Sequence, residues 1–268
     1  MGTLPQTLKR RLDTLLAERG LYETRSRAAA AVMAGDVRVG DRPAEKPGEM
    51  VPEDADVQVA ARLPFVSRGG VKLANALDEF GLDLSGRRAL DVGASTGGFT
   101  DCLLQRGAAS VIALDVAYGE LHWSLRQDPR VVVIERRNAR SLTPAELPYP
   151  PDLVVADVSF ISLTKVLPAV LRCTAERFDC LALVKPQFEV GRERVGRGGV
   201  VRSAEDRRAA LVAVAAAARS EMGTAVMGFA SSGLPGPAGN RESFVWLAEA
   251  GRPGEVGELE EAARGAEP

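Results

Sequence analysis

Four charged residues at the ends of predicted elements have the types that group-transfer chemistry uses. These residues are Lys72, Asp157, Lys185 and Glu242. Taken singly, each could be an ordinary charge in water at the end of an element. Asp157 and Lys185, however, each end an almost continuous apolar run, so their side chains should project from neighbouring strands at one edge of a sheet. A lysine and a carboxylate at that edge could take a proton from a hydroxyl group during transfer.

A glycine-rich turn follows the first predicted strand of this sheet. The chain runs Asp91-Val92-Gly93-Ala94-Ser95-Thr96-Gly97-Gly98-Phe99, from a strand straight into a helix. Such a turn lets a ligand approach the backbone at the carboxyl end of an open α/β sheet. A dinucleotide fingerprint would need glycine at position 95, and a P-loop would need lysine after Gly98. The turn fits neither phosphate-binding pattern, and a purely structural turn is its alternative interpretation.

A carboxylate after the second predicted strand indicates a nucleoside ligand. Asp115 follows Val111-Ile112-Ala113-Leu114. Its two oxygens can accept hydrogen bonds from both hydroxyls of a ribose. A nucleoside without pyrophosphate points to S-adenosylmethionine as the cofactor.

The predicted cofactor-binding residues surround this turn and the ends of the nearby strands. They are Ser67, Gly69, Asp91, Gly93, Thr96, Asp115 and Asn138. Ser67 and Thr96 are candidates to bind the methionine carboxylate. Asn138 is a candidate for the adenine edge, although an ordinary turn role is nearly as well supported. We expect Phe99 and Phe160 to be packing residues rather than stacking platforms.

The chain after residue 66 has the alternating pattern of a sheet that could position these residues. Strands are predicted at Ala89–Val92, Val111–Leu114, Val131–Ile134, Leu153–Ala156, Cys180–Val184, Ala225–Phe229 and Phe244–Leu247. Helices are predicted near Val71–Phe80, Phe99–Gln105, Leu163–Ala175 and Ala204–Ala218. This alternation predicts an α/β fold, with a mostly parallel sheet of seven strands covered on both faces.

The first 60 or so residues predict a separate, small α+β module. Two helical patterns, interrupted at Gly20, are followed by short strand patterns around residues 37–39 and 57–59. Arg25 and Arg27 flank the start of the second helix, where basic side chains and backbone amides can bind phosphates. On charge alone, an exposed helix face is an equally good interpretation.

The order of residues in this module resembles the S4 RNA-binding domain. The resemblance is carried by Arg11-Leu12-Asp13, Glu18-Arg19-Gly20-Leu21, Gly35-Asp36-Val37-Arg38-Val39 and Lys46-Pro47-Gly48. It implies a module that docks on structured RNA rather than one that catalyses a reaction. The residues that it implies on the phosphate side are Arg11, Arg25, Arg27 and Lys46.

A second basic stretch lies between glycines at residues 191–199. Arg192, Arg194 and Arg197 are candidate RNA contacts there, and a solvated basic loop is the alternative. The net charge of the chain is −2, so any RNA-binding surface must be local.

The catalytic candidates occur in the order of the K-D-K-E tetrad of the FtsJ-like ribose 2′-O-methyltransferases. With the S4-like module in front, the chain resembles the TlyA family of ribosomal RNA 2′-O-methyltransferases, also labelled haemolysin A. The motifs that carry this resemblance are S-R-G-G-x-K-L, D-V-G-A-S-T-G-G-F-T-D, D-V-S-F-I-S, K-P-Q-F-E and N-x-E. It implies a class I, Rossmann-like methyltransferase fold, S-adenosylmethionine as cofactor, and cytidine riboses of 16S and/or 23S rRNA or ribosomal subunits as substrate.

For this reaction, the tetrad would have a division of labour. Lys185 would act as the base, which requires a neutral amine, and the ordinary lysine pKa of about 10.4 would have to be lowered by burial or by a nearby cation such as Lys72. Asp157 would orient Lys185. Lys72 and Glu242 would position the target ribose.

Composition excludes several other classes of protein. The chain has 268 residues, 46% hydrophobic and 26% charged, which is typical of a globular protein. Three cysteines and one histidine, His122, offer no zinc cluster, and we expect no metal site. The longest small-apolar stretch, 209–218, is about half of the ~20 residues that span a bilayer, and no signal peptide pattern is visible. We therefore expect a cytoplasmic monomer without a membrane segment.

The predicted organisation has four parts. Residues 1–61 form the S4-like domain, 62–66 a linker, 67–250 the methyltransferase domain and 251–268 an acidic, flexible tail. Two rival functions remain: a non-catalytic RNA-binding factor of the ribosome, and the pore-forming activity that the haemolysin label suggests. The lack of a spanning segment or lytic helix makes the second physically weak.

Overall fold

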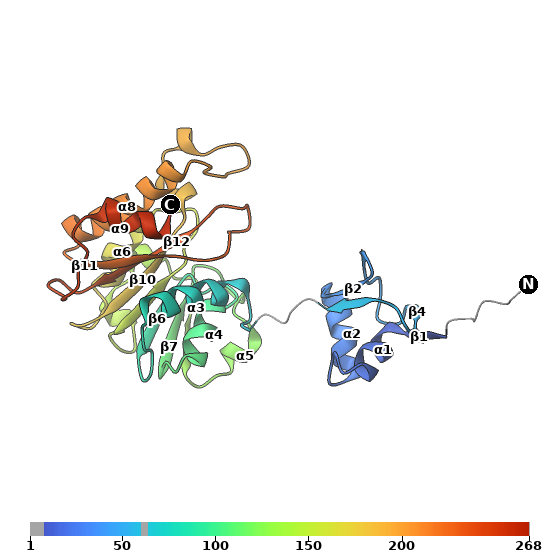
Figure 1. Ribbon diagram of the computed structural model, residues 1–268. Helices are drawn as coiled ribbons and strands as arrows, with labels where there is room; N and C mark the ends of the chain where they lie inside the picture. Colours follow the sequence, from blue (N-terminus) through green and yellow to red (C-terminus); the bar gives the residue numbers. More distant parts are fainter. Residues whose placement is uncertain (1–7, 60–63, 268) are drawn as a thin grey trace, which may run out of the picture. The chain divides into compact units, whose positions relative to one another are not determined.

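Two compact units make up the chain, and each is described by itself. The computed structural model describes residues 8–59 and 64–267 (Figure 1). The first unit comprises Met1–Arg62 and the second Leu63–Pro268. Residues 62 and 63 of the predicted linker lie outside the described residues.

The first unit packs two helices against short antiparallel strands. Its helices are α1 (Leu12–Glu18) and α2 (Arg25–Ala34). One sheet pairs β1 (Lys9–Arg11) with β4 (Met50–Pro52), and the other has the order β3 (Arg42–Pro43), β2 (Val37–Val39), β5 (Val57–Val59). Thr24 caps α2 by accepting a hydrogen bond from the Arg27 amide. Leu12, Leu16 and Val37 are fully buried and form the centre of the core.

The second unit is built on one sheet of seven strands. The strands are β6 (Arg88–Val92), β7 (Ser110–Leu114), β8 (Val131–Ile134), β9 (Leu153–Ala156), β10 (Asp179–Val184), β11 (Ala225–Ser231) and β12 (Ser243–Ala248). Their order is β11-β12-β10-β9-β6-β7-β8. All neighbours from β10 to β8 are parallel, and β12 pairs antiparallel with both of its neighbours. The predicted α/β fold with a mostly parallel, seven-stranded sheet is confirmed.

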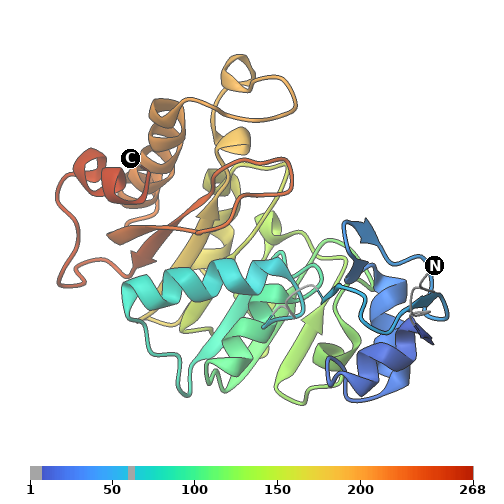
Figure 2. The same cartoon turned by 45° about the vertical axis from the view of Figure 1, so that its right-hand side comes forward.

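Helices cover both faces of this sheet (Figure 2). The first face is covered by α3 (Arg68–Phe80), α4 (Gly98–Gln105) and α5 (Trp123–Arg126), and the second by α6 (Leu163–Leu171), α8 (Ala204–Glu221) and α9 (Leu259–Ala266). Three 3₁₀ turns, at Ala139–Ser141, Pro144–Glu146 and Arg192–Arg194, and the single-turn helix α7 (Pro186–Glu189) lie in the connections. In the described part of the chain, no helix combines the length and the apolar character needed to cross a bilayer.

The C-terminal residues correct one prediction, because they are not a flexible tail. Helix α9 packs against α8 with Ala263 and Ala266 buried. Glu267 is also buried, and its Oε1 lies 2.5 Å from Nη2 of the Arg207 guanidinium. The prediction rested on the acidic composition, whereas the apolar residues recur at helical spacing on one face and leave the glutamates on the other.

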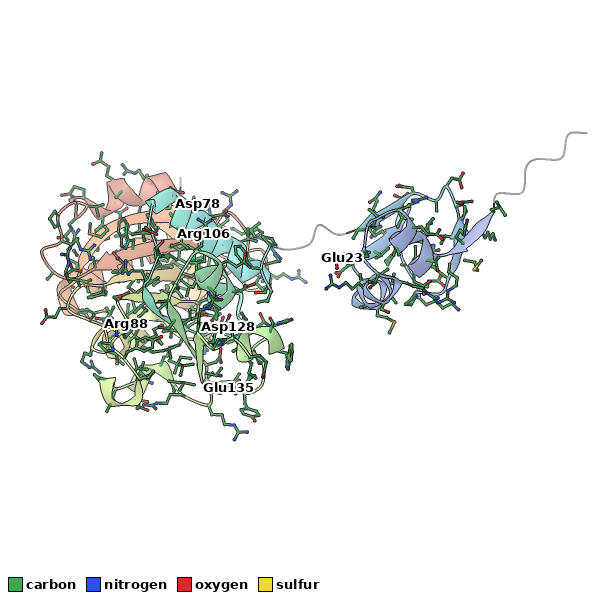
Figure 3. All side chains as sticks on the ribbon, turned by 90° about the horizontal axis from the view of Figure 1, so that it is seen from below. Glu23, Asp78, Arg88, Arg106, Asp128 and Glu135 are labelled. Carbon is green, nitrogen blue, oxygen red and sulfur yellow. The ribbon has the colours of Figure 1, made fainter. Side chains whose placement is uncertain are left out.

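Ion pairs on the surface link neighbouring helices. Arg106, which directly follows α4, and Asp78 of α3 lie side by side, with a guanidinium nitrogen 2.5 Å from a carboxylate oxygen (Figure 3). Both side chains are substantially exposed, so water screens the pair and its contribution to stability is small.

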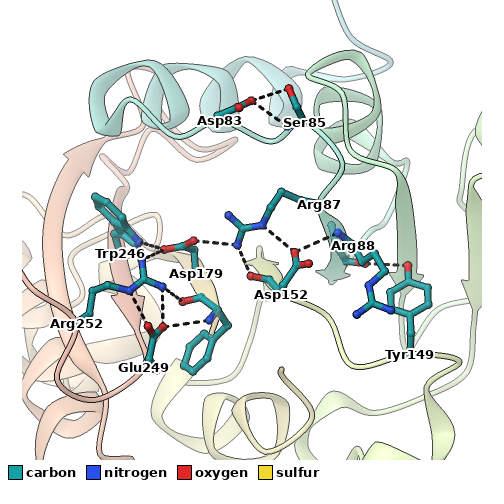
Figure 4. A network of polar contacts seen from close by, with 12 residues as sticks. Asp83, Ser85, Arg87, Arg88, Tyr149, Asp152, Asp179, Trp246, Glu249 and Arg252 are labelled. Carbon is teal, nitrogen blue, oxygen red and sulfur yellow. Dashed lines mark hydrogen bonds and ion pairs between the residues drawn. The ribbon is translucent and has the colours of Figure 1, made fainter. Parts of the chain in front are cut away.

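A denser polar network ties four strands together at the amino end of the sheet (Figure 4). The buried Asp179 accepts a hydrogen bond from the Trp246 indole at 2.9 Å and forms ion pairs with Arg87 and Arg252. Arg87 also pairs with Asp152 at 2.8 Å. The network therefore stabilises the amino ends of the strands. The candidate site lies at the opposite edge of the sheet, at the carboxyl ends.

Candidate functional site

A cavity of about 490 Å³ lies at the carboxyl ends of the central strands. The start of α3, the glycine turn after β6, the residues after β9 and β10, and Pro235 and Pro237 form its walls. Among the predicted site residues, those that line it are Ser67, Gly69, Lys72, Gly93, Thr96, Asp157 and Lys185. The fold thus brings together residues that are up to 118 positions apart, between Ser67 and Lys185.

The four tetrad residues form two ion pairs. Nζ of Lys185 lies 2.5 Å from Oδ1 of Asp157 and also donates a hydrogen bond to Oγ of Ser159 at 2.8 Å. Both residues directly follow neighbouring parallel strands, β10 and β9, which explains why they meet.

The second pair is more deeply buried. Nζ of Lys72, on α3, donates to Oε2 of Glu242 at 2.5 Å, and the two side chains are 8% and 1% exposed. Glu242 precedes β12, the strand beside β10. Each lysine is therefore matched with its own carboxylate, and the charge of Lys72 is balanced by Glu242.

Glycine at two positions allows the turn to pack closely against its neighbours. Gly93 has φ = +85°, and a Cβ there would clash with the backbone carbonyl oxygen of Asp157. A Cβ on Gly98 would clash with Oγ of Ser67. These close approaches set the shape of the cavity wall, because a larger residue would push β6 away from β9 or α4 away from α3.

Asp91 lies behind this wall rather than in it. Its side chain is fully buried, Oδ2 accepts a hydrogen bond from Oγ1 of Thr100 at 2.7 Å, and Oδ1 has no hydrogen-bond partner among the described residues. Burial raises the pKa of Asp91 to about 7, because removal from water penalises the charged form. Asp157 and Asp115 add a smaller repulsion in the same direction.

Asp115 lies next to the cavity and holds the glycine turn. Its Oδ2 accepts a hydrogen bond from the Ser95 amide at 2.7 Å, and its Oδ1 accepts one from the Ala117 amide at 2.8 Å. It lines a narrow pocket that shares Ala94 and Ser95 with the main cavity. Both carboxylate oxygens therefore have backbone donors.

Asn138 is placed differently from the other candidates. Its side chain is exposed and accepts a hydrogen bond from the Arg140 amide at 3.0 Å, which caps a 3₁₀ turn. It does not line the main cavity or the pocket of Asp115. This geometry matches the turn role that was the alternative for this residue.

The basic candidates of the first unit differ in their partners. Arg11 and Arg25 both pair with the buried carboxylate of Asp13, whose pKa is lowered to about 2, mainly by the hydrogen bond from Arg11. Arg27 pairs with the exposed Glu23, and Lys46 is exposed. Of these four basic residues, Arg27 and Lys46 are therefore the two that form no ion pair with a buried carboxylate in the described structure.

The second basic stretch is an ordered loop that Asn240 holds. Arg192, Arg194 and Arg197 are exposed, and Arg194 lies 3.5 Å from Asp206. The buried amide of Asn240 donates to the carbonyl of Gly199 at 2.8 Å and accepts from the amide of Val201 at 2.9 Å.

Phe160 corrects a second prediction. Phe99 is buried and packs against Phe244, as expected, with ring centroids 5.9 Å apart. Phe160 is instead 91% exposed, with φ = +65°, and its ring lies 5.3 Å from that of Phe188. A left-handed backbone at a phenylalanine is sterically unfavourable, and hydrophobic character alone does not reveal it.

Some residues at the site escaped prediction, among them an arginine and two prolines. Arg68, Pro235 and Pro237 line the main cavity. Arg68 also donates a hydrogen bond to the carbonyl of Pro235 at 3.0 Å. Only the resemblance motif around Arg68 offered a signal, because the prolines belong to a loop without periodicity.

Comparisons with known proteins agree with this geometry. The FtsJ-like methyltransferase family model matches residues 65–249, and the S4 domain model matches residues 10–57. The 16S/23S rRNA (cytidine-2′-O)-methyltransferase TlyA of Mycobacterium tuberculosis is 52% identical over 239 residues, which cover 88% of this chain and 89% of that protein. Hemolysin A of Brachyspira hyodysenteriae is 40% identical, covering 72% of this chain and 80% of that protein.

Solved structures show the same organisation. A structure described as a hemolysin of Streptococcus thermophilus has a TM-score of 0.73 and 38% identity, covering 97% of this chain and 96% of that one. Together with the tetrad at the carboxyl edge of the sheet, these matches establish the family. The chain belongs to the FtsJ-like methyltransferases and, within them, to the TlyA family, in which an S4 domain precedes the methyltransferase domain.

Proposed function

We propose that this protein transfers a methyl group from S-adenosylmethionine to the ribose 2′-hydroxyl of a cytidine in ribosomal RNA. The observation that carries the proposal is the position of Lys185 at the edge of the main cavity, held by Asp157 and Ser159. The mycobacterial relative supports the substrate class, since its name specifies cytidine ribose in 16S and 23S rRNA.

The residues around the cavity fit S-adenosylmethionine. Gly69, Gly93, Ser67 and Thr96 line a space of about 490 Å³, a size typical of small-molecule sites. The carboxylate of Asp157 faces the cavity, so a negative charge lies beside the space proposed for the cationic cofactor. When bound, the cofactor supplies an electrophilic methyl group on a sulfonium.

Lys185 is the proposed base. A ribose hydroxyl is a weak nucleophile unless its proton leaves as the new bond forms, and only a neutral amine can take that proton. Asp157 and Ser159 hold Nζ in place, which reduces the entropy lost on reaching the reactive geometry. Lys72 and Glu242 are proposed to position the ribose from the neighbouring wall.

Recognition of RNA is proposed to use both units. Arg11, Arg25, Arg27 and Lys46 of the S4 domain and Arg192, Arg194 and Arg197 of the loop present cations to phosphates. We propose that the protein acts as a monomer in the cytoplasm.

The test is transfer of labelled methyl from S-adenosylmethionine to purified 30S subunits, 50S subunits and free rRNA. We expect the wild type to produce 2′-O-methylcytidine, and Lys185→Ala to lose at least about 10²-fold in rate, in line with general-base catalysis. Lys165→Ala, which removes an exposed lysine of α6, is the matched control. Equal affinity of all three proteins for cofactor and RNA locates the loss in the chemical step.

Other outcomes would favour the rival functions. Binding of RNA and cofactor by the wild type without methyl transfer to any substrate would favour a non-catalytic ribosome factor. Leakage of liposomes at low protein concentration would revive the pore-forming function.

A further inference from the structure

A second cavity, of about 400 Å³, adjoins Lys185 and Glu242. The two cavities share only Lys185 and Pro237. Glu242 lines the second cavity but not the main one. Phe160, Phe188 and Gln187 form another part of its wall. Of the predicted cofactor residues, four line the main cavity and Asp115 lines the pocket beside it. None of them lines the second cavity, so this space is left to another ligand.

The side-chain amide of Gln187 is incompletely bonded. Its Oε1 is buried and has no hydrogen-bond partner among the described residues. A buried acceptor without a donor costs about 1–3 kcal/mol, so a ligand that brings a donor to this oxygen would gain a comparable free energy. The nearby rings of Phe160 and Phe188, 5.3 Å apart, offer no donor to this oxygen.

The position of Lys185 links the two cavities to one substrate. Gln187 lies two residues after Lys185, on α7. If a ribose hydroxyl reaches Nζ of Lys185 while the methyl donor occupies the main cavity, the base of the same nucleotide can enter the second cavity. Enzymes that modify nucleotides commonly take the target out of its stack and bind the base in such a pocket.

We propose that Gln187 determines base specificity by accepting a hydrogen bond from the exocyclic amine of the target cytosine. This inference rests on the proposed function. Cytosine presents an amine donor at the position where uracil presents a carbonyl acceptor. Oε1 of Gln187 would bond to the amine of cytosine, whereas the carbonyl of uracil would require the amide to turn over and present Nε2, which penalises uracil as long as the amide keeps its present orientation.

The experiment compares cytidine with uridine at the position methylated by the wild type, in otherwise identical RNA. A bidentate or buried base contact is worth about 1–3 kcal/mol, so we expect the wild type to prefer cytidine by about 10–100-fold in kcat/KM. Gln187→Leu keeps the approximate shape but removes the acceptor, and the preference should fall to about threefold or less. Affinity for S-adenosylmethionine should stay within about twofold.

Two further variants make the result specific. Gln187→Glu retains acceptor oxygens and should keep a preference for cytidine, even if its absolute rate falls. Gln127→Leu removes an exposed glutamine elsewhere and should match the wild type.

Each contrary result has a separate meaning. A Gln187→Leu protein that keeps the wild-type ratio between cytidine and uridine would overturn the role of Gln187, even if its overall rate falls. A wild type that uses both bases equally would overturn it as well. Failure of the wild type to methylate any RNA would overturn the proposed function, and this inference with it.

Discussion

At the scale of single residues, the chemistry of the site depends on which carboxylate pairs with each of the two lysines. Lys72 and Glu242, which are both expected to position the ribose, form a buried ion pair, while Lys185 pairs with Asp157. The two pairs occupy different walls, so one lysine is locked into the protein and the other lies at the junction of both cavities. This difference makes Lys185 the better candidate for the base.

The raised pKa of Asp91 leads to a testable effect of pH on stability. Its pKa is raised from 3.8 to about 7, mainly by burial. Between these pH values, the folded protein holds a proton that the unfolded chain has released, so this group makes stability fall as pH rises through that window. In Asp91→Asn, that contribution is absent.

We therefore expect the free energy of unfolding of the wild type to decline relative to Asp91→Asn between pH 5 and pH 8, by about 2–3 kcal/mol, since each pKa unit corresponds to about 1.4 kcal/mol. Urea unfolding of both proteins without cofactor, at unit steps of pH, measures the difference. A difference that is independent of pH would show that Asp91 titrates normally in the folded protein.

At the scale of elements, short connections carry much of the site. The long strands and helices provide a rigid frame, whereas α7, the loop 191–202 and the turn before β12 supply the walls of the second cavity. Asn240 joins two of these connections, because its amide bonds the backbone at Gly199 and Val201.

We expect Asn240→Ala to loosen the loop without unfolding the sheet. Two backbone groups would lose their partner, at a cost of about 1–3 kcal/mol, so amide exchange in residues 196–202 should accelerate by about tenfold or more. Hydrogen–deuterium exchange measures this, with the strand β10 as internal reference. Asn75→Ala, which removes one bond from an exposed asparagine to the carbonyl of Ser232, is the control. Unchanged exchange in the loop would contradict a clamp role for Asn240.

At the scale of the whole molecule, the two units divide the proposed work. The second unit holds both cavities, and the first unit offers cations on an S4 domain. Arg27 and Lys46 are the suitable cations to replace, because removing Arg11 or Arg25 would also unbalance the buried Asp13.

Two variants test these regions: a double variant, Arg27→Ala with Lys46→Ala, and a triple variant, Arg192→Ala with Arg194→Ala and Arg197→Ala. We expect each variant to bind RNA about tenfold more weakly and with a smaller salt dependence. The combined variant should show the sum of the two free-energy changes, because contacts on separate units act independently. Filter binding at several salt concentrations checks this, and cofactor affinity should not change. Normal RNA binding by either set would remove that region from the interface.

The local sequence pattern was enough to predict much of the sheet and the glycine turn of the second unit. Strand β9 is an unbroken apolar run and β10 is apolar after Asp179, so burial and β propensity predict such strands without knowledge of their neighbours. The glycine turn after β6 was equally visible, because a short-range change from strand to helix requires it. Composition misjudged only the end of the chain, where helical spacing of apolar residues outweighs the acidic charge in α9.

The sequence by itself determined most of the strands, the glycine turn and, through its resemblance motifs, the family, and it predicted the four tetrad residues. Only the tertiary structure decided that Lys72 meets Glu242, 170 positions away, and that Lys185 meets Asp157. It also decided that Phe160 is exposed and that Gln187 keeps a buried oxygen without a described partner. The physical reason is that local periodicity depends on neighbouring residues, whereas ion pairs and cavities depend on which distant strands the sheet places side by side.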